Sequence, residues 1–276
     1  MKRQILLPTD FSDNAWCAID YAIKLFKDEP CEFRLLNSIA LKVSSMSSLS
    51  DRLLRVIKEK AIEDLNALKD EIDTASANPN HEFDTVVSTL DLFHAMENEV
   101  QKNNIQFIVM GTKGATGAKE FFFGSNTVKV IKKIKNCSLL IIPDEYDYVT
   151  PKQIAFPTDF KVSLSKDQLK PLRDILKLHE AKIRILHINE EEELSEEQEQ
   201  NFKNLKSYLS DLNCSFHWMP EYSTKDHAIK EFIEDLEIDM LTMVSHDKSW
   251  IERLANKAVI KKIGFRPFVP FLVLKA

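Results

Sequence analysis

The stretch that decides how this chain is interpreted is Met110-Gly-Thr-Lys-Gly-Ala-Thr-Gly-Ala-Lys-Glu-Phe-Phe-Phe-Gly-Ser-Asn-Thr127. The chain has 276 residues and only five glycines, and four of these lie within the stretch: Gly111, Gly114, Gly117 and Gly124. Glycine is used where the backbone takes a positive φ or lies in direct contact with another group. The clustering therefore predicts a single loop whose backbone is approached closely.

The flanking segments indicate that this loop connects a strand to a helix. Residues 105–110 are almost continuously apolar, which is typical of a parallel strand buried on both faces. Residues 125–134 have apolar side chains at helical spacing with lysines between them, and Ser125 stands at or near the expected N-cap. A helix N-terminus offers N–H groups and a positive dipole end, so the loop is predicted to hold a phosphate. A plain turn is the structural alternative.

The glycine spacing separates this loop from two well-known phosphate motifs, since neither G-x-x-x-x-G-K-[ST] nor G-x-G-x-x-G is present. The pattern Gly111-x2-Gly114-x9-Gly124-Ser125, with Met110 before it and Asn126-Thr127 after it, resembles the nucleotide-binding signature of the universal stress protein family, in the subgroup that binds ATP. Pro8-Thr-Asp-Phe-Ser12, after the first predicted strand, is similar to the opening of that family.

The resemblance implies a set of residues that contact ATP, whose phosphates can carry Mg²⁺. Asp10 would accept hydrogen bonds from the adenine or ribose, with a cap of the first helix as its structural alternative, and both roles can hold together. Ser38 would pack on the base, next to Asn37, where the family often has histidine. The implied set is Pro8, Thr9, Asp10, Ser38, Met110, Gly111, Gly114, Gly124, Ser125, Asn126 and Thr127.

The chain also contains an internal duplication. Residues 2–11 reappear as residues 152–160, and Val130-Ile-Lys-Lys-Ile134 reappears as Val259-Ile-Lys-Lys-Ile263. We therefore expect two tandem domains, residues 1–148 and residues 149–276. Strands and helices alternate in both, which predicts the α/β class, with two doubly wound, five-stranded parallel sheets. By resemblance this is the fold of universal stress proteins and of adenine nucleotide alpha hydrolases.

Apolar periodicity places the expected elements. In the first domain we expect strands near 3–7, 31–38, 82–88, 105–110 and 138–142, and helices near 12–26, 51–72, 91–102 and 125–134. In the second we expect strands near 153–157, 181–188, 214–219, 239–244 and 268–274, and helices near 163–179, 195–211, 224–236 and 252–263. The serine-rich residues 40–49 are expected to form a loop.

The second domain keeps Pro157-Thr-Asp159 and loses the glycine loop. Val244 takes the position of Gly111, and Ser245-His-Asp-Lys248 replaces the stretch through Gly114. Side chains at these positions would occupy the space that a triphosphate needs, and the carboxylate of Asp247 would repel the phosphates. We therefore expect one ATP per chain, bound by the first domain.

Charge and cysteine usage exclude several classes of partner. The net charge is −6 and neither half is basic, which argues against nucleic acid. The cysteines, which show no C-x-x-C spacing, are expected to be reduced core residues: Cys17, Cys31, Cys137 and Cys214. The sequence shows no signal-peptide pattern and no apolar run that approaches 18 residues. We expect a cytoplasmic protein with neither a membrane partner nor a metal site.

Three functions are compatible with these patterns. A nucleotide-dependent regulatory or stress-response module with a protein partner is favoured. A slow ATPase or a phosphoryl or adenylyl transferase would need a catalytic base that the sequence does not show. A ligand-free scaffold would leave the glycines unexplained. The apolar last strands, 138–142 and 268–274, are expected to pair within the chain as a pseudo-dimer, and further association into a homo-oligomer stays open.

Overall fold

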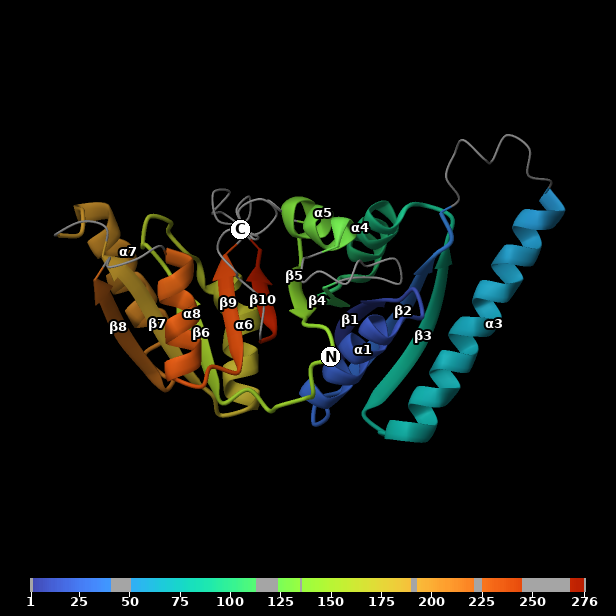
Figure 1. Ribbon diagram of the computed structural model, residues 1–276, viewed down its shortest axis with the longest axis horizontal. Coiled ribbons are helices and arrows are strands. Elements are labelled where there is room, and N and C mark those ends of the chain that lie inside the picture. Colours follow the sequence, from blue (N-terminus) through green and yellow to red (C-terminus); the bar gives the residue numbers. More distant parts are fainter. Residues whose placement is uncertain are drawn as a thin grey trace. The chain divides into compact units, whose positions relative to one another are not determined.

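The computed structural model describes residues 2–40, 51–112, 124–134, 136–189, 193–220, 225–244 and 269–275. These residues pack as two compact units, shown as ribbons in Figure 1. Of the described residues, the first unit contains those up to Cys137 together with Asp144–Tyr148, and the second contains Ser138–Pro143 and those from Val149 onward.

The first unit is a parallel sheet with helices packed on it. Its elements are β1 (Arg3–Pro8), α1 (Asp13–Leu25), β2 (Cys31–Ser38), α3 (Asp51–Ser76), β3 (His81–Ser88), α4 (Leu92–Asn103), β4 (Phe107–Gly111) and α5 (Ser125–Lys133). The strand order is β3-β2-β1-β4, and each neighbouring pair of these strands is parallel. Helix α1 packs on β4, α3 packs on β3, and α4 packs on β1, β2 and α5.

Local sequence explains where these helices lie. Ser12 caps α1 by accepting the N–H of Ala15, as predicted, and Asp91 caps α4 by accepting the N–H of Phe93. Helix α4 ends at Asn104, whose left-handed φ of 49° terminates the helix. In α3 the buried side chains recur at helical spacing, because one face lies on the sheet: Ala61, Leu65, Leu68 and Ile72.

The second unit has a similar alternation. Its elements are β5 (Ser138–Ile142), β6 (Gln153–Pro157), α6 (Lys166–Leu178), β7 (Lys182–Asn189), α7 (Glu196–Tyr208), β8 (Cys214–Pro220), α8 (Lys225–Asp235), β9 (Met240–Val244) and β10 (Phe271–Leu274). The strand order is β5-β10-β9-β6-β7-β8. Capping boxes start two helices, Ser165 with Gln168 for α6 and Ser195 with Gln198 for α7.

Strand β5 is the one described strand of its unit that runs antiparallel to its neighbour. It pairs with β10 so that Ile141 lies opposite Phe271 and Leu139 lies opposite Val273. The sequence predicted that these two apolar strands pair, and they do. Because of this pairing, β5 packs with the second unit, although it precedes the expected domain boundary at residue 148.

The predicted α/β fold is confirmed, and most expected elements are present within a few residues. The largest shift of a helix start is that of α6, which begins at Lys166 because Ser165 forms its capping box. Other predictions lie outside the described residues: the loop at 40–49 apart from Ala40, the helix at 252–263, Gly114, Gly117 and Ser245–Lys248.

All four cysteines lie in described residues, and none of them forms a disulfide. Burial raises the pKa of the Cys31 thiol to about 12 and that of the Cys214 thiol to about 11. Cys31 and Cys137 are buried, as predicted for core residues, whereas Cys17 and Cys214 are only half-buried.

Candidate functional site

The predicted site residues lie where β1, β2 and β4 end and where α5 begins. Parallel strands of an open α/β sheet end at one edge, and ligands bind outside that edge where the strand order reverses. Strand β1 stands between β2 and β4, so this reversal lies between β1 and β4. Pro8, Thr9, Met110 and Gly111 are buried at these strand ends, whereas Asp10 is exposed.

The turn after β1 is held by its own side chains. Thr9 Oγ1 accepts the N–H of Phe11 at 3.0 Å, and Phe11 has a left-handed φ of 62°. Asp10 Oδ1 accepts the Ser12 N–H at 3.3 Å and the Ser12 hydroxyl at 2.6 Å. Asp10 does not cap the first helix itself, which was its predicted structural alternative, because the N-cap of α1 is Ser12 and Asp10 only accepts the hydrogen bonds of Ser12. Its contact with a nucleotide stays a prediction.

The two residues that end β2 bind to neighbouring backbone. The buried Asn37 side chain donates from Nδ2 to the Thr9 carbonyl at 2.8 Å, which joins the ends of β1 and β2. The Ser38 hydroxyl donates to the Leu90 carbonyl at 2.6 Å, which joins the end of β2 to the segment before α4. The base contact implied for Ser38 stays a prediction, and here its hydroxyl proton is donated within the protein.

The two ends of the glycine loop are tied together. The Gly124 N–H donates to the Thr112 carbonyl at 2.7 Å. Thr127 is buried, and its hydroxyl oxygen lies 3.1 Å from the Thr112 carbonyl and 3.3 Å from the Gly111 carbonyl. The two residues that flank the loop, Thr112 and Gly124, therefore lie side by side, and residues 113–123 between them are outside the described residues.

The N-terminus of α5 has no side-chain cap. Its N-cap is Gly124, which directly precedes the predicted Ser125, and the first turn contains no acidic residue. Ser125 and Asn126 are exposed in this turn. Because Thr127 already donates to backbone carbonyls, Ser125 is the exposed hydroxyl of the two predicted for phosphate contact. N–H groups, the positive dipole end and an exposed hydroxyl together suit an anion.

Packing within the protein explains why residue 111 is a glycine, without reference to a ligand. A Cβ atom at this position would lie 2.7 Å from the carbonyl oxygen of Asn14 and 3.2 Å from its carbonyl carbon. Real Cβ atoms essentially never come this close to a backbone oxygen, so glycine lets β4 end directly against the first turn of α1. Sequence analysis assigned this glycine to phosphate contact alone, because it could not reveal the approach of α1.

Ion pairs join α4 to α5 close to the uncapped N-terminus of α5. Lys129 Nζ lies 3.0 Å from Asp91 Oδ1, and His94 Nδ1 pairs with Asp91 Oδ2. Hydrogen bonds from His94 and then from Lys129 lower the pKa of Asp91 to about 2. Lys129 Nζ also lies 5.1 Å from the centroid of the Phe93 ring. The sequence predicted Asp91 at a helix start, but its pairing with Lys129 depends on how the two helices pack.

A second contact missed by the sequence analysis reaches the base of the glycine loop. The Thr112 hydroxyl donates to Asp144 Oδ1, which lies just after β5. The same segment packs on α1, because the rings of Tyr146 and Tyr148 lie 6.1 Å and 5.1 Å from the ring of Tyr21, measured between centroids. The start of the loop is thus held by a segment that follows it by about thirty residues.

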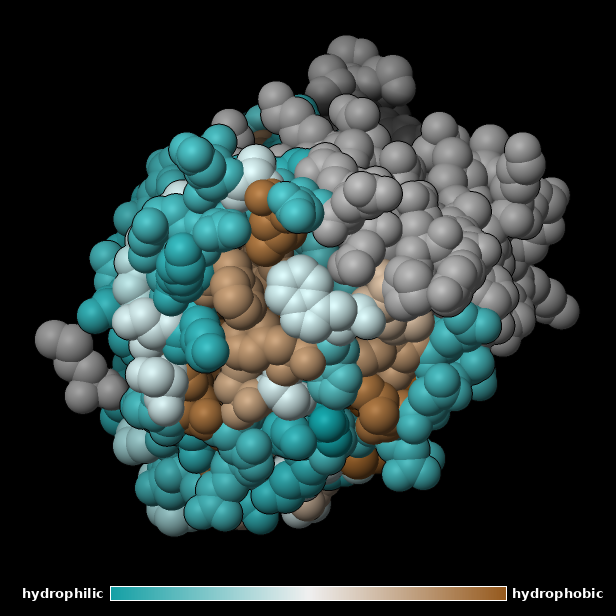
Figure 2. Space-filling model, turned by 90° about the vertical axis from the view of Figure 1, so that its left-hand side faces the viewer, coloured by the Kyte–Doolittle hydropathy of each residue, from teal (hydrophilic) through white to brown (hydrophobic). Residues whose placement is uncertain are grey.

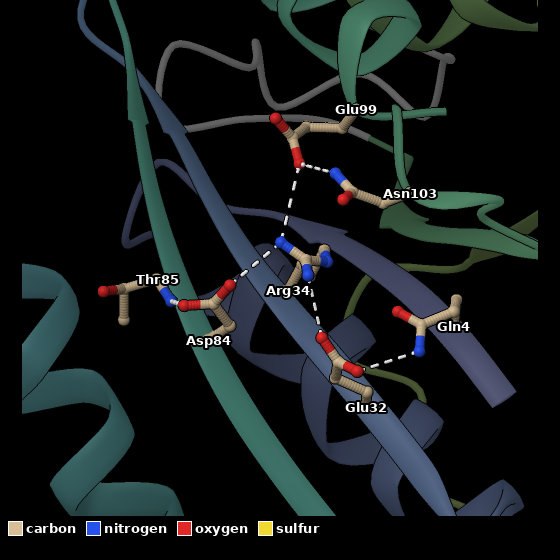
Figure 3. Close-up of polar contacts among 7 residues, drawn as sticks. All are labelled: Gln4, Glu32, Arg34, Asp84, Thr85, Glu99 and Asn103. Atoms are coloured by element: carbon tan, nitrogen blue, oxygen red, sulfur yellow. Dashed lines mark hydrogen bonds and ion pairs between the residues drawn. The ribbon is translucent and has the colours of Figure 1, made fainter. Parts of the chain in front are cut away.

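A separate group of charges, shown in Figure 3, lies between the sheet and α4. The Arg34 guanidinium is 2.8 Å from Glu32, 2.9 Å from Asp84 and 3.9 Å from Glu99. Gln4 Nε2 donates to Glu32 at 2.9 Å, and this bond, ahead of Arg34, lowers the pKa of Glu32. The positive charge of Arg34 therefore partly neutralises carboxylates on β2, β3 and α4. We interpret this group as a structural link between the three elements.

The second unit repeats the turn found after β1. Thr158 Oγ1 accepts the N–H of Phe160 at 3.1 Å, and Phe160 has a left-handed φ of 56°. His187 Nδ1 lies 2.9 Å from the Thr158 carbonyl, as the Asn37 amide does at Thr9 in the first unit. The backbone geometry of the two turns is therefore alike.

Helix α7 then closes the turn of the second unit. Gln198 Nε2 donates to the Asp159 carbonyl at 2.8 Å, and Asn201 Nδ2 donates to the Phe160 carbonyl at 2.9 Å. Phe160 is 2% exposed and stacks on His187, with 4.9 Å between ring centroids. Side chains of the protein therefore occupy the outside of this turn. The sequence contained the polar residues of α7 but no signal that they reach back to it.

Comparison with known proteins agrees with this geometry. The model of the universal stress protein family matches residues 1–143. The chain belongs to the universal stress protein family. Among curated relatives of this family member, universal stress protein YxiE of Bacillus subtilis is 25% identical over 152 residues, which cover 51% of this chain and 99% of the relative. Universal stress protein MJ0577 of Methanocaldococcus jannaschii is 26% identical over 160 residues, which cover 51% of this chain and 95% of the relative.

Among solved structures, a universal stress protein from Archaeoglobus fulgidus has a TM-score of 0.69 and 21% identity, and the match covers 99% of this chain and 96% of that chain. At this identity the match establishes the fold alone. The two curated relatives each correspond to about half of this family member, whereas the Archaeoglobus protein corresponds to nearly all of it. A chain of two universal-stress-protein-like halves is in keeping with both findings.

Within the described ranges, no group of three or more histidine, cysteine, aspartate or glutamate side chains is placed to hold a metal ion. None of the helices in the part of the chain that the structure describes is long and apolar enough to cross a membrane.

Proposed function

We propose that the first domain, residues 1–148, binds ATP, and that the chain acts in the cytoplasm as a nucleotide-dependent regulatory module of the stress response. The observation that carries the proposal is the uncapped N-terminus of α5, beside a loop whose ends are tied together at Thr112. The loop contains Gly114 and Gly117, and such a loop offers backbone N–H groups to phosphate oxygens. Family membership supports a nucleotide as the anion.

The proposed contacts divide between the two ends of the nucleotide. Gly114, Ser125 and Asn126 would face the phosphates, with Mg²⁺ as their counterion. Asp10 and Ser38 would face the adenosine. The remaining residues of the predicted set hold these groups in place, because they are buried in strand ends or tie the loop: Pro8, Thr9, Met110, Gly111, Gly124 and Thr127.

A regulatory role is favoured over catalysis. Phosphoryl transfer needs a group that positions or deprotonates the nucleophile beside the γ-phosphate. The described side chains at the loop ends include Ser125, Asn126, Thr112, Thr127 and Asp144. Both threonine hydroxyls are already donated within the protein, and the Asp144 carboxylate accepts that of Thr112. A slow ATPase or an adenylyl transferase is therefore the second reading, and a ligand-free scaffold is the third.

We propose that the second domain, residues 149–276, has a degenerate site and binds no ATP. Gln198 and Asn201 of α7 hold the turn at Asp159, and Val244 ends the strand that corresponds to β4. Saturation of the full chain should therefore require one equivalent of ATP in isothermal titration calorimetry. Saturation near two equivalents would contradict a degenerate second site.

We further propose that the two domains form an intrachain pseudo-dimer through β5 and β10. The antiparallel pairing of Ile141 with Phe271 supports this, since it joins the last strand of one sequence repeat to the last strand of the other. Ile141 is fully buried, so Ile141→Asp should separate the strands and increase the radius of gyration in small-angle scattering. An equally compact and equally stable variant would refute the pairing as the link between the domains.

The nucleotide itself is tested by mass spectrometry of gently purified, full-length protein. Co-purified ATP in substoichiometric to equimolar amount is the expected result. If ADP co-purifies, and if the protein forms further ADP when it is incubated with added ATP, the ATPase function would be favoured. Absence of any nucleotide, together with no heat of binding for added ATP, would leave the scaffold as the better description.

A further inference from the structure

Strand β8 forms one edge of the sheet in the second unit. It is last in the strand order, and among the described residues its one neighbouring strand is β7. Residues 214–219 (Cys-Ser-Phe-His-Trp-Met) include no aspartate, glutamate, lysine or arginine. Proteins usually protect an exposed edge with charges, prolines or a covering element, because unpaired backbone groups attract other strands. Strand β8 has no charged side chain that would protect this edge, and its one proline, Pro220, is the last residue of the strand.

The corresponding edge of the first unit is protected. Strand β3 ends its sheet order and carries Glu82 and Asp84, both exposed. The 26-residue helix α3 packs on β3, whereas its counterpart α7 has 13 residues. Trp218 on β8 is left 45% exposed, although it touches Phe202 of α7 with 5.7 Å between ring centroids. The two edges of one duplicated fold therefore differ in charge and in cover.

A groove runs along β8 on the side of α8. Its volume is about 490 Å³, and four of its lining residues are consecutive in β8 while the rest come from α8 and its C-terminal end: Phe216, His217, Trp218, Met219, Phe232, Asp235 and Leu236. Figure 2 faces this side of the molecule and shows apolar surface, tan to brown, near the middle of the face, with hydrophilic side chains around it. Apolar surface at a strand edge favours a partner that is itself a strand with apolar side chains.

The hydrogen-bond pattern indicates which backbone groups face outward. The Ile183 N–H of β7 donates to the Asn213 carbonyl at 2.8 Å, so the backbone groups of Asn213 face β7. Alternate residues of a strand point their N–H and C=O to opposite neighbours, so Ser215, His217 and Met219 face β7. The backbone groups of Phe216 and Trp218 therefore point away from the sheet and can pair with an added strand.

We propose that a second copy of this chain pairs its β8 antiparallel to this β8, about a two-fold axis at His217. In this register Phe216 lies opposite Trp218 of the second copy. By symmetry, Trp218 lies opposite Phe216 of the second copy. Both are outward-facing residues, so each pair exchanges two backbone hydrogen bonds. Aromatic residues opposite each other also stabilise paired strands.

The same strand explains why a second copy fits this edge. An isologous interface requires a surface that complements itself, and an uncharged strand with Phe216 and Trp218 symmetric about His217 meets this requirement. Strand β3 does not, because Glu82 and Asp84 would face the same carboxylates of a second copy. On the other face of β8, His217 and Met219 of the second copy would lie along the groove beside Phe232.

The first test measures the mass of the full-length chain by analytical ultracentrifugation over a range of concentration. We expect a reversible dimer of the 31.8 kDa chain. Trp218→Lys should raise the dissociation constant about 100-fold, because symmetry introduces the charge twice. Thr85→Lys on β3 is the matched control and should leave it unchanged. A chain that is monomeric at all concentrations, or a dimer that tolerates Trp218→Lys, would overturn the proposal.

A second test does not depend on the stability of Trp218→Lys. In a Cys214→Ser background, His217→Cys places two thiols opposite each other in a pair without backbone hydrogen bonds, where strands bring side chains closest. Oxidation by oxygen with copper phenanthroline should yield a covalent dimer in non-reducing electrophoresis. Ser215→Cys is the control, since its two copies lie several residues apart. Equal cross-linking of both variants, or of neither, would refute this register.

Discussion

Residues Pro8-Thr-Asp-Phe11 and Pro157-Thr-Asp-Phe160 are identical and form the same turn, yet the two turns have different surroundings. Phe11 is 42% exposed, whereas Phe160 is 2% exposed. The difference arises from α7, which follows the next strand, because Gln198 and Asn201 donate hydrogen bonds to the carbonyls of the turn and Phe202 packs on the Phe160 ring. Two turns with the same sequence and backbone geometry therefore have different side chains packed around them. Identity of a short motif therefore does not establish identity of function.

The largest expected effect concerns the glycine loop that the second unit lacks. Gly114→Val places a β-branched side chain where the backbone is proposed to meet phosphate. ATP binding should be lost, with circular dichroism and the unfolding transition little changed. Isothermal titration calorimetry measures the binding. Unchanged affinity in a folded variant would refute the phosphate-binding role of the loop.

The next largest effect separates the two phenylalanines. Phe160→Ala should lower the free energy of unfolding by about 3–5 kcal/mol, because a fully buried ring packed on His187 is removed. Phe11→Ala, its matched control, should change the free energy by no more than about 0.5 kcal/mol. Urea unfolding followed by circular dichroism gives both values. Similar losses for the two variants would show that the difference in burial has no energetic consequence.

A smaller effect distinguishes packing from ligand contact within the loop. Gly111→Ala should lower the free energy of unfolding by about 1–3 kcal/mol, since its Cβ would meet the Asn14 carbonyl oxygen at 2.7 Å. Gly124→Ala is the control, because Gly124 has an ordinary φ of −60° at the N-cap, and its loss should stay below about 1 kcal/mol. Thermal unfolding without nucleotide is the measurement. If Gly111→Ala proves as stable as the wild type, the packing explanation for this glycine is wrong.

The smallest effect concerns the ion pairs of Asp91 with His94 and Lys129, which join α4 to α5 in the first unit. The pKa of Asp91 lies near 2, below the ordinary value of 3.8, so its contribution to stability is present above about pH 4 and lost as the pH falls toward 2. Asp91→Asn should remove this part of the acid dependence with little effect at pH 7, because the carboxylate is half exposed. Unfolding measured from pH 7 to pH 2 tests this, and an unaltered acid profile would argue against the pairing.

The order of strands and helices was determined by the sequence itself. Continuous apolar runs such as residues 105–110 predict buried parallel strands, and Ser12 and Ser195 predict the helix starts where they are found. The glycine cluster also identified the region of the candidate site, since glycine is so rare elsewhere in the chain. These signals are local, because each follows from the preferences of neighbouring residues.

Tertiary structure alone decided which side chains serve that site and which ones close its counterpart. Gly111 is explained by the carbonyl of Asn14, and Phe160 is buried by residues of α7 about forty positions later. The assignment of β5 to the second unit likewise follows from its pairing with β10. Contacts of this kind join residues far apart in the chain, and local propensity carries no information about them because they form only when the elements pack.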